Sequence, residues 1–231
     1  VYWPIMLYAL GIELPEKIFA HGWWLINEGK MSKSRGNTVN PLEMIEVYGL
    51  DAYRYFLLRD VPFGLDGNFS QEGIIKRYNS DLANDLGNLV YRTLTMIEKY
   101  FKGNVPQVNL DTVTSDSDTS DILLKIRNLP KEVSLKMEEQ DFSLALEAIW
   151  DLIAAANKHI EHTKPWNLSK DGKTKELEIF IKLLVLVIRE VAGQILPFMP
   201  STSESIMQQI GEDKIHKGQP LFPRLLTASD T

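Results

Sequence analysis

A short segment near the N-terminus is dense in cationic and hydroxyl side chains. Residues 29–37 read Gly-Lys-Met-Ser-Lys-Ser-Arg-Gly-Asn, which places two lysines and an arginine within six residues. Ammonium and guanidinium groups donate hydrogen bonds to anionic oxygen, so this composition suits a phosphate-binding loop. It is not a Walker A loop, because Met31 follows Lys30 where that motif needs serine or threonine. A solvated basic loop is the alternative interpretation.

A second group of residues could bind RNA. Asn88 and Arg92 are four positions apart, so a helix would place the amide and the guanidinium on one face. Such a pair can bind base edges and phosphate, although it is also common on solvated helix surfaces. Trp166 follows Lys164 and Pro165 at an expected helix end. It can be either a stacking platform for a base or a packing residue.

The elements that must position these residues change character near residue 70. The segments 18–20 and 23–26 resemble strands, so the first part of the chain predicts an α/β arrangement. From Gln71 to Phe101 the apolar residues recur at spacings of one, three and four, which predicts one long amphipathic helix. Residues 103–119 are rich in turn formers and predict a surface connection.

The second half predicts a helical bundle. We expect helices over residues 120–139, 142–163 and 175–195, with a short helix beginning near Ser201. The fold class is therefore mainly α, with a small α/β part in front of the bundle. The expected division is residues 1–70 and residues 71–231.

Composition limits the possible functions. The 231 residues include no cysteine, which excludes disulfides and thiolate metal sites. The longest apolar stretch, residues 179–188, is interrupted by Lys182 and is much shorter than the ~20 residues needed to span a bilayer. The net charge of −6 speaks against a protein that binds nucleic acid through bulk charge alone. Residues 111–141 nevertheless hold eight acidic side chains against four basic ones, whereas residues 76–102 hold five basic side chains against three acidic ones.

Other residues of chemical interest favour ordinary roles. His159 and His162 have Glu161 between them, but two histidines without a third ligand predict a solvated helix face rather than a metal site. Trp150 lies among apolar residues and is expected in the core. No metal site is expected in this chain.

The pentapeptide Lys-Met-Ser-Lys-Ser at residues 30–34 matches the signature of class I aminoacyl-tRNA synthetases. Together with the segments 21–24, 49–56 and 218–224, it makes the chain similar to methionyl-tRNA synthetases. The resemblance implies that residues 1–70 are a C-terminal remnant of a Rossmann-type catalytic domain with a connecting module. It implies that residues 71–231 are a helical anticodon-binding domain.

The resemblance also implies residue roles. Lys33 and Lys30 would be catalytic, and the ATP-binding residues would be Lys30, Met31, Ser32, Lys33 and Ser34. Cationic groups there would neutralise the charge that develops on the phosphoryl group and on the departing pyrophosphate. ATP would enter with Mg²⁺. The His-Ile-Gly-His motif of the family is absent from this sequence, and the chain does not begin with methionine. We therefore expect a fragment that is inactive by itself.

The RNA partner implied by the resemblance is tRNA-Met, with Asn88, Arg92 and Trp166 as the anticodon-binding residues. ATP and methionine would be the other substrates of the full-length ligase. The ligase would be cytoplasmic and would not bind a membrane. Three alternatives remain at this point. Leucine, isoleucine, valine and cysteine synthetases share the pentapeptide; a tRNA-binding module could lack catalysis; and a helical interaction protein could carry the pentapeptide by chance.

Overall fold

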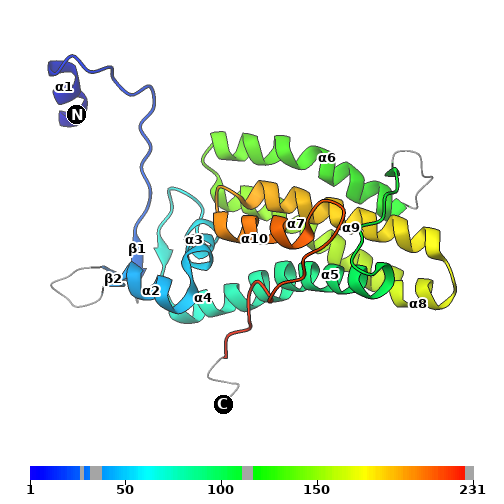
Figure 1. Cartoon of the computed structure of the whole chain (residues 1–231). Coiled ribbons are helices and arrows are strands. Elements are labelled where there is room, and N and C mark those ends of the chain that lie inside the picture. The colour runs from blue at the N-terminus through cyan, green and yellow to red at the C-terminus, as the bar shows by residue number, and fades with distance from the viewer. Residues whose placement is uncertain (27–28, 32–37, 111–116, 227–231) are drawn as a thin grey trace.

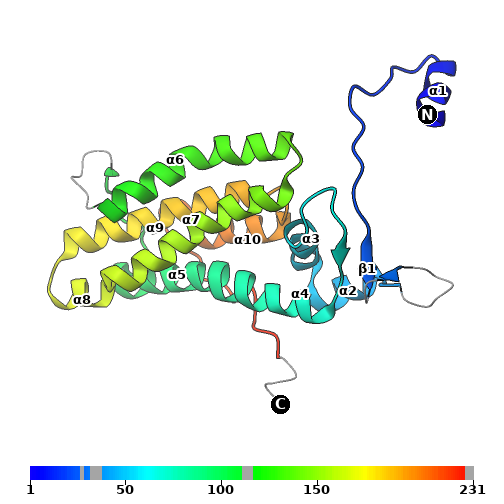
Figure 2. The same cartoon turned by 180° about the vertical axis from the view of Figure 1, so that it is seen from behind.

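The computed structural model describes residues 1–26, 29–31, 38–110 and 117–226. A small sheet with two short helices lies at one end of a helical bundle (Figure 1). The view from behind shows the same arrangement, with helix α1 (Tyr2–Ala9) standing away from the rest of the chain (Figure 2). No residue of α1 is buried. The expectation of a mainly helical fold with a small α/β part is confirmed.

The sheet consists of three short strands in the order β2-β1-β3. Strand β1 (Trp24–Ile26) pairs antiparallel with β2 (Gly29–Lys30) and parallel with β3 (Gly67–Asn68). The strand expected at residues 18–20 is not formed, and Ile18 and Phe19 are exposed. A strand needs a partner for its backbone groups, and the described part of the chain provides none there.

Two helices connect the sheet to the bundle. Helix α2 (Pro41–Tyr48) is capped by Asn40, whose side-chain oxygen accepts a hydrogen bond from the amide of Leu42 at 3.1 Å. Gly49 separates α2 from helix α3 (Leu50–Arg59), and its φ of +86° favours glycine. Because the chain turns at Gly49, α3 can pack against both α2 and the bundle.

The long helix expected over residues 71–101 is present and contains a local change of winding. Helix α4 (Gln71–Arg77) continues into a π-helical segment, η2 (Tyr78–Gly87), and then into α5 (Asn88–Phe101). The residues at both junctions keep right-handed helical dihedrals, so the helix is unbroken. The buried residues Tyr78, Leu82 and Leu86 are spaced by four, so they form one apolar face along this segment.

The remaining helices form the bundle. They are α6 (Ser117–Glu138), α7 (Phe142–Thr163), α8 (Pro165–Lys170), α9 (Thr174–Ile195) and α10 (Pro200–Ile210). Four of them lie close to their expected ranges, whereas α8 was not expected. Helices α7 and α9 supply most of the core, with eleven buried residues each. Within the described residues, no helix is long and apolar enough to cross a membrane.

Two expectations for the second half are wrong in detail. Residues 103–110 were expected to be an unpacked surface connection, but Val105 and Leu110 are buried in the bundle core. His159 was expected on a solvated face, yet only 5% of its surface is exposed and its ring lies 5.2 Å from that of Phe180. In both cases apolar neighbours that are distant in sequence cover the residue. Trp150 is buried, as expected.

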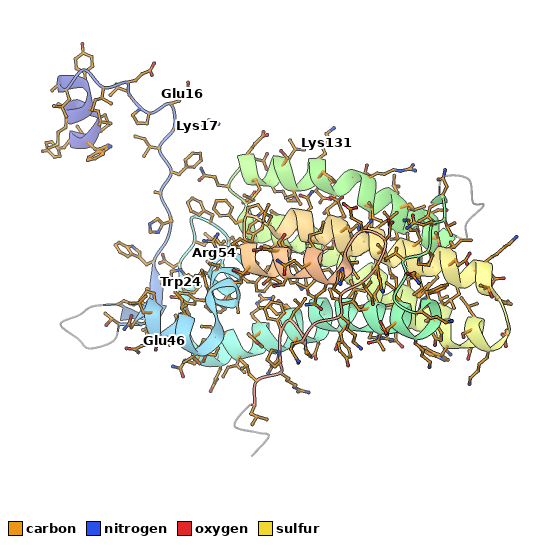
Figure 3. All side chains as sticks on the ribbon, viewed as in Figure 1. Glu16, Lys17, Trp24, Glu46, Arg54 and Lys131 are labelled. Atoms are coloured by element: carbon orange, nitrogen blue, oxygen red, sulfur yellow. The ribbon has the colours of Figure 1, made fainter. Side chains whose placement is uncertain are left out.

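Helix α3 is joined to the end of the bundle by polar contacts. The Oδ2 atom of Asp51 accepts hydrogen bonds from the amide and the hydroxyl of Thr202, at 2.6 and 2.8 Å, in the first turn of α10. Arg54 donates hydrogen bonds to the carbonyl oxygens of Phe198 and Pro197, at 2.8 and 2.7 Å (Figure 3). These contacts hold the sheet-bearing end of the chain in a defined position relative to the bundle.

Candidate nucleotide loop and nucleic-acid interface

The basic pentapeptide follows strand β2 directly. Lys30 is the last residue of β2. Its side chain, Ser32, Lys33 and Ser34 lie outside the described residues. Met31 can be described, and it is partly buried against the small core cluster of Met44, Tyr53, Phe56, Phe69 and Ile74.

The chain returns to the same cluster after the loop. Val39 packs against it one residue before the α2 cap. Met31 and Val39 therefore attach both ends of segment 32–38 to one apolar cluster beneath the sheet. The described residues on either side of the basic segment therefore lie at the sheet end of the molecule. Sequence reasoning assigned Met31 to ATP binding and did not anticipate its packing role.

The two polar residues expected to face RNA lie on one side of α5. Asn88 is exposed at the first position of the helix, directly after the π-helical segment. Arg92 is one turn further on, and its Nη1 atom lies 2.8 Å from Oε1 of Glu161 on α7. The two side chains of this ion pair are 36% and 62% exposed. Exposed pairs of this kind are worth about 0–1 kcal/mol, so Arg92 can leave Glu161 for an RNA group at little cost.

Trp166 lies in the short helix that follows α7. Helix α7 ends at Lys164, whose φ of +49° turns the chain, and α8 begins with the buried Pro165. Trp166 itself remains 40% exposed. The packing alternative is disfavoured by this exposure, because a tryptophan that fills a core position would be covered. The indole is open to a partner and is held on a turn with a buried proline.

Helix α7 runs beside the long helix and brings these residues into one region. Trp150 donates a hydrogen bond to the carbonyl of Asp81 at 3.3 Å, and Asn157 donates one to the carbonyl of Asp85 at 3.2 Å. The next contact along both helices is the Arg92–Glu161 pair. The two helices are therefore parallel at this contact, and Trp166 follows five residues after the partner of Arg92. The segment that leads to Trp166 is thus in contact with α5 at Arg92, 74 positions earlier in the sequence.

A partly buried polar network connects α3 with the π-helical segment. Asp81 accepts hydrogen bonds from the Tyr55 hydroxyl at 2.8 Å, from Arg77 at 3.2 Å and from Ser80. Arg77 also contacts Asp60 at 3.1 Å. Burial, together with the neighbouring Asp81, raises the pKa of the Tyr55 hydroxyl far above its ordinary value. Tyr55 therefore remains a hydrogen-bond donor at all physiological pH values, and the network ties α3 to the long helix.

Asp85 gives a testable pH dependence. Burial, followed by the charge of Asp81, raises the pKa of the Asp85 carboxyl above its ordinary value of 3.8. Ionisation of the Asp85 carboxyl therefore lowers the free energy of unfolding. This loss grows as the pH rises from the ordinary pKa through the raised pKa, and it reaches its full size by neutral pH. We expect Asp85→Asn to raise the thermal unfolding midpoint at pH 7 by on the order of 1–2 °C. At about pH 3 the gain should vanish, because the aspartate is then protonated in both states.

The matched control for this prediction is Asp151→Asn. Asp151 is an exposed aspartate in the middle of α7. The measurement is thermal unfolding followed by circular dichroism at both pH values. An equal gain at pH 3 and pH 7, or a lower midpoint for Asp85→Asn at pH 7, would contradict the assigned cause.

Family models match both parts of the chain. Residues 1–94 match "tRNA synthetases class I (M)", and residues 120–228 match "Anticodon-binding domain of tRNA ligase". The chain is 46% identical to the methionine–tRNA ligase of Halalkalibacterium halodurans, covering 97% of this chain and 37% of that protein. It is 45% identical to that of Caldanaerobacter subterraneus, with coverages of 97% and 38%. The chain thus spans little more than a third of the length of these curated relatives.

Solved structures show the same likeness. Mycobacterium tuberculosis methionyl-tRNA synthetase in complex with methionyl-adenylate superposes with a TM-score of 0.88 at 37% identity, covering 97% of this chain and 47% of that one. Its free form gives a TM-score of 0.86 at 33% identity. The similarity extends over the sheet, the connecting helices and the bundle together.

Proposed function

Because the chain belongs to the methionyl-tRNA synthetase family, we propose that it is the part of a methionine–tRNA ligase that carries an ATP-site loop and binds the anticodon. The proposed activity is ATP-dependent attachment of methionine to tRNA-Met in the cytoplasm. The proposed division is residues 1–70 for the catalytic remnant and residues 71–231 for the anticodon-binding domain. The sequence lacks the His-Ile-Gly-His motif, so we propose that this chain is not sufficient for catalysis.

The proposed role of residues 30–34 is electrostatic. When the methionine carboxylate attacks the α-phosphate of ATP, negative charge grows on the transferring group and on pyrophosphate. Lys33, assisted by Lys30, would neutralise this charge, while Met31, Ser32 and Ser34 would shape the loop. Mg²⁺ would enter bound to ATP. The packing of the flanking residues Met31 and Val39 against one apolar cluster supports this role, because it fixes the two points between which the segment with Lys33 must run.

The proposed role of the bundle is anticodon recognition by Asn88, Arg92 and Trp166. The observation that carries it is the approach of α5 and α7, because the ion-pair partner of Arg92 lies five residues before the exposed Trp166. Asn88 offers both a donor and an acceptor to a base edge, and Arg92 adds forked donors. Trp166 offers an aromatic surface for an unstacked base, as single-stranded RNA requires. The surface therefore combines stacking with base-edge contacts.

The proposal is tested by RNA binding to this chain. We expect an RNA hairpin with a CAU loop to bind more tightly than the same stem with a scrambled loop, by about tenfold or more, because several base contacts would be lost. Fluorescence anisotropy at a fixed, moderate salt concentration would measure both dissociation constants. Equal affinities would contradict methionine-specific anticodon recognition.

A tRNA-binding module without any catalytic role is the second candidate. It is favoured by one observation, which is that the His-Ile-Gly-His motif is absent from this sequence. The two candidates differ in the expected role of Lys33. A catalytic role requires Lys33 to affect amino-acid activation in a chain that also contains the upstream domain, whereas a binding module does not.

A further inference from the structure

The C-terminal segment, defined here as residues 212–226, folds back over the long helix (Figure 1). At one end its backbone pairs with the turn after α5. The amide of Val105 donates to the carbonyl of Asp213 at 2.8 Å, and that of Ile215 donates to the carbonyl of Gly103 at 2.9 Å. Ile215 is only 5% exposed and belongs to the bundle core. This end of the segment is therefore firmly attached.

The other end is attached to the π-helical segment, where the Tyr78 ring packs against that of Phe222 at 5.7 Å. Asn79 donates a hydrogen bond to the carbonyl of Leu225 and accepts one from its amide, both at 2.9 Å. The segment thus runs from the end of α5 back to η2, antiparallel to the long helix. Between these two attachments the segment contacts both α10, where the Gly218 amide donates a hydrogen bond to the side chain of Gln209, and α5, through Lys217.

Lys217 lies on this path and is held against α5 by two contacts. Its Nζ atom donates a hydrogen bond to the Thr95 hydroxyl at 3.0 Å and lies 4.6 Å from the centre of the Tyr91 ring. Tyr91 and Thr95 are three and seven residues after Asn88, so they share its side of the helix. The lysine ammonium is therefore placed beside the proposed anticodon-binding residues, although it is 125 positions away from Arg92 in sequence.

The charge of Lys217 is not neutralised in the way that neighbouring charges are. Arg92 pairs with Glu161, and Arg77 pairs with Asp60 and Asp81. Among the residues that the structure describes, Lys217 forms no ion pair. Its side chain is exposed, and an ammonium has three donors, of which one binds Thr95. An exposed, positioned and unpaired cation next to an RNA site is suited to a phosphate.

We propose that Lys217, held over Tyr91 by the C-terminal segment, binds the sugar–phosphate backbone of the RNA strand whose bases meet Asn88, Arg92 and Trp166. The inference rests on the proposed function and extends it. A lysine at a phosphate contributes affinity and salt dependence but carries no base information. Lys217 therefore sets how tightly any loop binds, while the other three residues set which loop is preferred.

The test compares Lys217→Gln with the unchanged chain, using the CAU and scrambled hairpins over a series of salt concentrations. We expect the variant to bind both hairpins about 3- to 10-fold more weakly at low salt. The slope of log K against log salt should fall in magnitude by about 0.7, the value for one phosphate contact on a single strand. The ratio between the two hairpins should not change. Lys217→Arg, which keeps the charge, should retain the slope.

The control variant is Lys131→Gln, which removes an exposed lysine of α6 on another side of the bundle (Figure 3). It should leave both affinities and the slope unchanged. An unchanged slope in Lys217→Gln would overturn the backbone contact, and so would a changed ratio between the hairpins. If the unmodified chain shows no CAU preference, the proposed function fails separately. The slope still decides whether Lys217 contacts a phosphate.

Discussion

Replacing Trp166 with alanine is expected to weaken binding of the CAU hairpin by about 5- to 150-fold. This range corresponds to the roughly 1–3 kcal/mol that one base–aromatic stack contributes in single-stranded RNA complexes. The scrambled hairpin should lose less affinity. Its loop lacks the bases that bind Asn88 and Arg92, so its bases are positioned less well on Trp166 and stacking contributes less binding free energy. The preference for CAU should therefore shrink together with the affinity. The measurement is the pair of dissociation constants at one salt concentration.

The structure supplies a control for this substitution. Trp23 is 56% exposed, comparable to the 40% of Trp166, but it lies beside the sheet at the other end of the molecule. Trp23→Ala should leave both RNA affinities unchanged. The unfolding midpoint of Trp166→Ala should stay within a few degrees of the unmodified chain, since the indole is not in the core. A folded Trp166→Ala chain that still binds CAU with full affinity and preference would remove Trp166 from the proposed site.

The largest effect on chemistry is expected for Lys33. In a full-length ligase that contains this sequence, Lys33→Ala should lower the rate of methionine-dependent ATP–pyrophosphate exchange by about 10²- to 10³-fold. That is the typical loss when one positioned group that stabilises transition-state charge is removed. The effect should appear mainly in the maximal rate, because the charge is greatest in the transition state and smaller in bound ATP.

Two comparisons make the Lys33 result interpretable. Lys17→Ala removes an exposed lysine from the segment between α1 and β1, and should leave exchange unchanged (Figure 3). Lys33→Ala in the present chain should still bind the CAU hairpin, because strand β2, which ends at Lys30, and helix α8, which carries Trp166, lie at different ends of the molecule (Figure 1). An exchange rate within about threefold of the unmodified ligase would contradict the catalytic role and favour a binding module.

Local sequence patterns predicted most of the helices. The range 142–163 matches α7, and the range 71–101 matches the continuous helix formed by α4, η2 and α5. These elements were accessible because apolar spacing and helix ends act within a few residues of one another. The same patterns did not predict the π-helical winding of residues 78–87. Side chains from outside the helix, those of Tyr55, Trp150 and Asn157, form hydrogen bonds to this segment, and local spacing carries no information about them.

The sequence-based predictions were wrong where strand pairing or burial depends on a distant part of the chain. The apolar residues 18–20 resemble a strand, but no neighbouring strand pairs with them in the described structure. Val105 and His159 were assigned to the surface from their polar surroundings in sequence, yet the bundle covers both. Burial depends on which elements pack against a residue, and these elements cannot be identified from the residue's neighbours in sequence.

For the candidate site, too, some features follow from the sequence and others only from the folded structure. The identities of Lys33, Asn88, Arg92 and Trp166, and the family to which they point, follow from the sequence, because motif spacing is a local property. The pairing of Arg92 with Glu161 and the position of Lys217 over Tyr91 follow only from the folded structure. They depend on contacts between segments 69 and 126 residues apart, which form when the helices pack and bury a shared apolar core.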